Sequence, residues 1–129
     1  LLMFWFYLIE MYIVEKFHAY TMPRLRPNSR VKDLPDLALL ATAQTLDAKR
    51  LRKALDQTFT FRRTHALPAS VPAPQSTWTT PYLAMAREDE LAWPTLDDVT
   101  KATQAFLDPV LDGGLVATWR PLEWMWRAE

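Results

Sequence analysis

The chain has 129 residues, 50% of them hydrophobic, and its formal net charge is zero. A chain of this length can bury one core, and we expect one domain over residues 1–129. The lack of cysteine excludes disulfides and zinc–thiolate sites, and two histidines alone cannot complete a tetrahedral zinc site. The two glycines, Gly113 and Gly114, are adjacent, which excludes a glycine-rich phosphate loop.

Charge is distributed unevenly along the chain. Residues 1–65 carry 11 Lys/Arg against 6 Asp/Glu, whereas residues 66–129 carry 4 against 9. A basic half favours an anionic partner such as a nucleotide or RNA. Folding of the acidic half against the basic half explains the same pattern.

The first residues, LLMFWFYLIEMYIV, are strongly apolar, but Glu10 and Glu15 interrupt the run of about 20 apolar residues that a membrane span needs. We therefore expect no membrane association. Residues 3–9 lack a helical period, which favours a buried strand, although a buried helix is also compatible. We expect preceding chain to cover this segment, so that the sequence is the C-terminal piece of a longer protein.

Apolar residues at helical spacing predict helices near residues 10–21, 33–45, 47–63, 80–91 and 96–112. Pro23 and Pro27 end the first helix. Asn28 or Ser29 is placed to cap the second, and Pro35 is tolerated in its first turn. The fold class is therefore mainly α, a bundle of about five helices with room for one N-terminal strand.

Local signals also mark the later helices. Asp47 is a typical cap for the third helix, Thr80 followed by proline opens the fourth, and Thr95 with Asp98 resembles a capping box for the fifth. Residues 64–77 contain three prolines and are expected to form a loop. We expect the tryptophans of the tail to close the core, with base stacking as the alternative; they are Trp119, Trp124 and Trp126.

Two segments carry a family resemblance. "EKFHA" (residues 15–19) matches a K-x-x-A motif, and "SRVKDLPDL" (residues 29–37) matches an R/K-D-x-x-D-L motif. Together they resemble the C-terminal half of the AbiEii-like nucleotidyltransferases, the toxins of type IV toxin–antitoxin systems. The resemblance continues in "LRKALDQTFTFRRTHALPASVP", in "FLDPVL" and in the tail, and so covers nearly the whole chain beyond residue 10.

The sequence lacks the G-S turn and the metal-binding D-x-D pair that begin the catalytic core of this family. The resemblance therefore implies that the chain is the helical C-terminal part of a nucleotidyltransferase-fold protein, with the metal ligands in a preceding part. We expect this part alone to be inactive and to bind neither Mg²⁺ nor nucleotide tightly.

For the whole protein, the resemblance implies transfer of a nucleotide from a nucleoside triphosphate to an RNA such as a tRNA, with Mg²⁺ as the metal. It further implies a cytoplasmic bacterial toxin of an abortive infection system, with an antitoxin as a protein partner. The alternative is a non-catalytic helical module that binds an antitoxin, RNA or the missing core.

The resemblance also assigns roles to residues. Lys16 would contact the triphosphate, and Asp33 would lie at the catalytic centre as a base or an orienting group. Arg30 and Lys32 would hold phosphates or pair with Asp33, and Asp36 would orient one of these two cations. We expect Lys16 and Asp33 to lie within roughly 10 Å of each other, because both must reach one triphosphate.

Arg62 and Arg63 fall on a family segment and would contact RNA or nucleotide. Each assigned residue has an ordinary structural alternative. A helical lysine such as Lys16 commonly covers apolar surface, and Asp33 or Asp36 is typical of the first turn of a helix. The basic run at residues 49–53 is equally typical of a solvated helix face.

Overall fold

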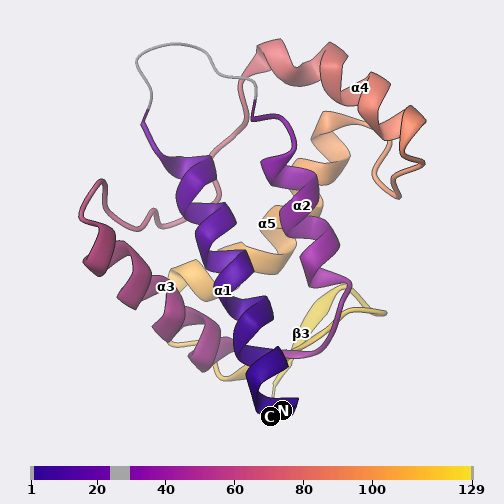
Figure 1. Ribbon diagram of the computed structural model, residues 1–129. Helices are drawn as coiled ribbons and strands as arrows, with labels where there is room; N and C mark the ends of the chain where they lie inside the picture. The colour runs from indigo at the N-terminus through magenta and orange to yellow at the C-terminus, as the bar shows by residue number, and fades with distance from the viewer. Residues whose placement is uncertain (1, 24–29, 129) are drawn as a thin grey trace.

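The computed structural model describes residues 2–23 and 30–128, with side chains from Leu8 onward (Figure 1). These residues form five α-helices: α1 (Leu2–Thr21), α2 (Asp33–Ala41), α3 (Ala48–Arg62), α4 (Thr79–Glu88) and α5 (Leu96–Asp112). A short 3₁₀ helix, η1 (Ser76–Trp78), precedes α4. Three strands form an antiparallel sheet in the order β1 (Leu46–Asp47), β2 (Ala117–Arg120), β3 (Met125–Ala128). The prediction of a mainly α fold is confirmed.

The predicted N-terminal strand is wrong, because residues 3–9 lie in α1. An apolar run without periodicity is compatible with either structure. Here the run continues without a break into the amphipathic part of the chain, so its residues form the first turns of a 20-residue helix. The strands come instead from the segment before α3 and from the C-terminal tail.

The helix ends follow the local signals to different degrees. Asp47 accepts a bond from the backbone N–H of Arg50 at 3.0 Å, and Thr95 with Asp98 forms the predicted capping box. The first helical residue of α2 is Asp33, as predicted, and its N-cap position is Lys32. The predicted caps Asn28 and Ser29, and Pro27, lie outside the described residues.

Several helix boundaries differ from the prediction, including the end of α4, which lies at Glu88 rather than near residue 91. α2 ends at Ala41 rather than near residue 45, because the chain must leave the helix to pair β1 with β2. α4 begins at Thr79, one residue before the predicted cap Thr80 and directly after η1. Because η1 already turns the chain, the helix needs no side-chain cap there.

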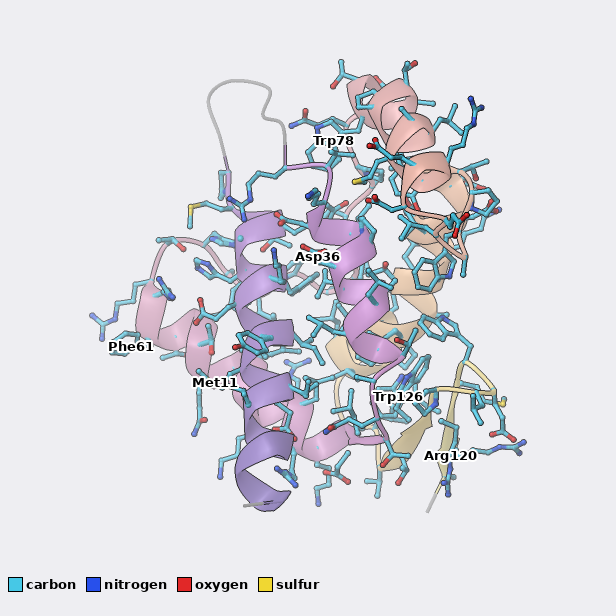
Figure 2. The ribbon with its side chains drawn as sticks, turned by 45° about the vertical axis from the view of Figure 1, so that its right-hand side comes forward. Met11, Asp36, Phe61, Trp78, Arg120 and Trp126 are labelled. Carbon is cyan, nitrogen blue, oxygen red and sulfur yellow. The ribbon has the colours of Figure 1, made fainter. Side chains whose placement is uncertain are left out.

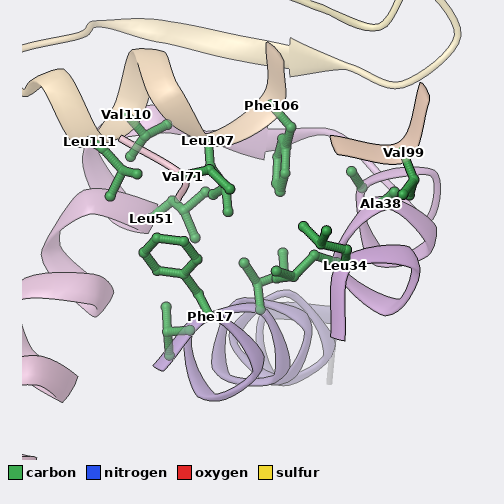
Figure 3. Close-up of a cluster of buried hydrophobic side chains, with 14 of the residues drawn as sticks. Phe17, Leu34, Ala38, Leu51, Val71, Val99, Phe106, Leu107, Val110 and Leu111 are labelled. Atoms are coloured by element: carbon green, nitrogen blue, oxygen red, sulfur yellow. The ribbon is translucent and has the colours of Figure 1, made fainter. Parts of the chain in front are cut away.

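The core lies between α1, α2, α3 and α5 (Figure 3). Each helix contributes large side chains with no exposed surface, including Phe17, Leu34, Leu51 and Phe106. α1 and α2 lie side by side and run in opposite directions (Figure 1). The end of α1 therefore meets the start of α2, and this junction positions the candidate site.

The tail tryptophans close the core, as expected. The indole N–H of Trp119 donates to the carbonyl of Ala41 at 2.9 Å, and the Trp119 side chain is fully buried. The indole N–H groups of Trp124 and Trp126 donate to carbonyls of α5. Among the described residues, no helix combines the length and apolar character that crossing a membrane requires.

Candidate functional site

Four charged side chains meet where α1 ends and α2 begins. The Lys16 ammonium nitrogen lies 2.8 Å from Asp36 Oδ2 and 3.7 Å from Asp33 Oδ1. Arg30 Nε lies 2.8 Å from Asp33 Oδ2, and Arg30 Nη2 lies 3.3 Å from Asp33 Oδ1. We call Lys16, Arg30, Asp33 and Asp36 the charged cluster. It brings Lys16 and Asp33 well within the expected distance of roughly 10 Å.

The packing of α1 against α2 explains why these residues meet. Ile13 and Phe17 of α1 and Leu34 and Leu37 of α2 are fully buried. Lys16 lies between the two α1 residues in the sequence, at the rim of this apolar contact. Its long side chain can therefore cover the rim while its ammonium group reaches the first turn of α2.

Burial differs sharply within the cluster. The Asp33 side chain is 2% exposed, whereas those of Lys16, Arg30 and Asp36 are 36%, 44% and 35% exposed. The bond to Asp33 also raises the pKa of Arg30 above its ordinary value. The cluster thus has a buried carboxylate on the inside and two cations at the surface, and the buried charge is paired, as burial requires.

The other predicted site residues lie in different surroundings. Lys32 is exposed and makes no ion pair with the described residues. Arg62 pairs with Glu15 at 2.5 Å and so ties α3 to α1. Arg63 ends α3 in a left-handed conformation with φ of 54°, beside an open depression of about 720 Å³ that Phe61 also lines. The structure therefore does not bring Arg62 or Arg63 into the charged cluster.

The basic run on α3 is partly used for packing. Arg50 pairs with the buried Glu10 at 3.2 Å. Arg52 donates to the carbonyls of Val110 and Leu111 at 3.2 and 2.6 Å, where α5 ends. A cation at a helix C-terminus satisfies carbonyls that have no partner within the helix. At these two positions the basic residues hold the helices together.

Two histidines, His18 near the end of α1 and His65 after α3, are linked by hydrogen bonds through Thr64. His18 Nε2 and His65 Nδ1 lie 2.8 and 2.9 Å from the hydroxyl of Thr64, and His65 Nε2 lies 2.7 Å from that of Thr21. Burial lowers the pKa of both rings, and the nearby charge of His65 lowers the pKa of His18 further. Sequence reasoning misses this network, because Thr64 and His65 lie more than 40 residues from their partners in α1.

The charged cluster does not fit a divalent metal ion. The described residues contain no group of three side chains that could hold one. Both carboxylate oxygens of Asp33 accept hydrogen bonds from Arg30, and Lys16 lies beside them. Two cations already neutralise the two carboxylates, so the cluster offers a metal no uncompensated negative charge.

Comparison with protein-family models identifies one family for this chain. The model of the nucleotidyl transferase AbiEii toxin, from type IV toxin–antitoxin systems, matches residues 2–119. No curated protein and no solved structure matches the chain significantly. The family match includes the whole charged cluster.

Proposed function

Because the chain belongs to the AbiEii family of nucleotidyltransferase toxins, we propose that its charged cluster is the phosphate-binding wall of a nucleotide site. The protein transfers a nucleotide from a nucleoside triphosphate to an RNA acceptor such as a tRNA, in the cytoplasm of a bacterium, and an antitoxin neutralises it. The observation that carries this proposal is the Lys16 ammonium, which is partly exposed and held by two carboxylates of α2.

A cation contributes most to phosphoryl chemistry when it is fixed before the substrate arrives. An ammonium group has three N–H donors. The Lys16 ammonium forms an ion pair with Asp36 at 2.8 Å, and Asp33 at 3.7 Å attracts it as well. Lys16 therefore has donors left for phosphate oxygens, and the two carboxylates hold its charge at the surface.

Asp33 acts in this proposal as a positioning residue. A general base must come within hydrogen-bond distance of the hydroxyl that it deprotonates. Asp33 is 2% exposed, and Arg30 occupies both of its oxygens. These contacts favour the orienting role over the role of a base.

A triphosphate must compete with Asp36 for Lys16. Both side chains of this pair are about one-third exposed, and exposed ion pairs are typically worth about 0–1 kcal/mol. Phosphate oxygens carrying several negative charges can displace one solvated carboxylate. The bond from Arg30 to the buried carboxylate of Asp33 can persist during this exchange, so the position of the cluster does not change.

The test uses the full-length protein and its toxicity in the cell. Lys16→Met and Asp33→Asn should each abolish toxicity while the circular dichroism spectrum stays unchanged. Lys49→Met is the matched control, because Lys49 is also an exposed helical lysine but makes no ion pair with the described residues; it should stay toxic. Full toxicity of a folded Lys16→Met variant would refute the proposal.

A further inference from the structure

A groove lies one helical turn beyond Lys16. It has a volume of about 190 Å³ and is lined by Tyr20 near the end of α1, by residues 72–75 of the proline-rich loop and by Trp78 of η1. Among the residues that line it, none carries a charged side chain. No pattern in the sequence predicts this groove, because its walls are about 50 residues apart.

The groove and the charged cluster are neighbours. Lys16 and Tyr20 are four residues apart on α1, and such pairs lie on the same helix face with about 5–6 Å between their Cβ atoms. The charge of Asp33 is also close enough to add to the effect of burial in raising the pKa of Tyr20. Figure 2 shows Trp78 and Asp36 in the upper part of the molecule, where α1 ends.

The walls of the groove are flat and held in place. The Tyr20 hydroxyl donates to the carbonyl of Pro72 at 2.6 Å, which fixes the ring. The Tyr20 and Trp78 ring centroids are 6.2 Å apart. Two prolines stiffen the opposite wall, and the half-buried Gln75 offers an amide that can both donate and accept hydrogen bonds.

We propose that this groove binds the base of the nucleoside triphosphate whose phosphates lie at the charged cluster; the inference rests on the function proposed above. A planar heterocycle matches an apolar groove with an aromatic wall, because stacking on an aromatic ring tolerates any base. The Gln75 amide then contacts the edge of the base. The phosphates point toward Lys16, one helical turn (about 5.4 Å) away along α1.

Three probes separate the two halves of the site in the full-length protein: adenosine, inorganic tripolyphosphate and ATP. Adenosine should shift the indole N–H signal of Trp78 in an NMR titration. Tyr20→Leu, which removes the aromatic wall, should weaken ATP binding by about tenfold and leave tripolyphosphate binding unchanged. Tyr20→Phe is the matched control, because it keeps the ring, and it should retain most of the ATP affinity.

Gln75→Ala provides a second variant at a half-buried loop position outside the core, and it should lower ATP affinity severalfold. If neither Tyr20→Leu nor Gln75→Ala changes the affinity for ATP, the proposal that the groove binds the base is wrong. It is also wrong if tripolyphosphate binding depends on Lys16 but adenosine does not shift the Trp78 signal. If Lys16→Met leaves tripolyphosphate binding unchanged while adenosine shifts the Trp78 signal, the phosphate-binding role of the charged cluster is wrong and base binding in the groove is supported. Failure of all three probes to bind would overturn both.

Discussion

Replacing Asp33 by asparagine tests whether the buried carboxylate holds the charged cluster together. The asparagine amide would keep the shape and one carbonyl oxygen but remove the negative charge that accepts two bonds from Arg30 at 2.8 and 3.3 Å. Each hydrogen bond to a charged group contributes about 1.5–3 kcal/mol to the free energy of unfolding, and this contribution disappears when the bond is lost. A carboxylate in the first turn of α2 adds about 0.3–1 kcal/mol through the helix dipole.

The net cost must be smaller than the sum of these contributions. Arg30 is 44% exposed and Lys16 is 36% exposed, so both cations regain water when the carboxylate is neutralised. The retained carbonyl oxygen also keeps one bond. We therefore expect Asp33→Asn to lower the free energy of unfolding by about 2 kcal/mol. Asp36→Asn is the matched control at the exposed end of the cluster and should cost about 0–1 kcal/mol.

Urea unfolding followed by circular dichroism measures both variants. With a slope of about 1–3 kcal/mol per molar urea, a loss of about 2 kcal/mol moves the midpoint by about 1 M. Salt at about 1 M should reduce the small effect of Asp36→Asn and leave most of the effect of Asp33→Asn, because buried pairs are screened less. Equal costs for the two variants would refute the structural role given to the buried carboxylate.

Other predictions concern the core and the buried ionisable groups. Trp119→Phe removes the N–H that donates to the last carbonyl of α2 and leaves a cavity, so it should cost about 3 kcal/mol in the same urea assay. Burial raises the pKa of Glu10, although the charge of Arg50 opposes this shift. The buried carboxylate therefore lowers the free energy of unfolding when it is ionised, and this effect is absent below the unfolded-state pKa of about 4.5. Glu10→Gln should stabilise the protein at about pH 7 but not at about pH 4. The pKa values of His18 and His65 are lowered, so the thermal midpoint should fall as pH drops below about 6.5. A midpoint that rises there would contradict the lowered pKa values.

The sequence predicts best where structure is set by neighbours along the chain. The bounds of α5 are predictable because a capping box begins the helix and Gly113 ends it. The proximity of Lys16 and Asp33 is predictable because their helices follow each other directly along the chain. The bidentate bond from Arg30 to Asp33, three residues apart, is equally local.

The remainder depends on contacts between distant segments. β1 pairs with β2 through Leu46 and Trp119, far apart in the chain, and neither segment alone shows a strand period. The groove depends on the bond from Tyr20 to Pro72, 52 residues away. The first turns of α1 resemble a strand in sequence because their apolar residues have no periodicity. They are helical because they continue directly into the rest of α1.

The most direct test of the central claim follows the side-chain NMR signals of the lysines while ATP is added. If the charged cluster is the phosphate wall, the Cε–Hε signal of Lys16 shifts at lower ATP concentration than the other lysine signals and reaches saturation. The same shift is reduced in Asp33→Asn, which removes one of the two carboxylates that hold the ammonium. Movement of the Lys49 and Lys53 signals on α3, with the Lys16 signal unchanged, would contradict the claim and place the phosphates on the other basic surface.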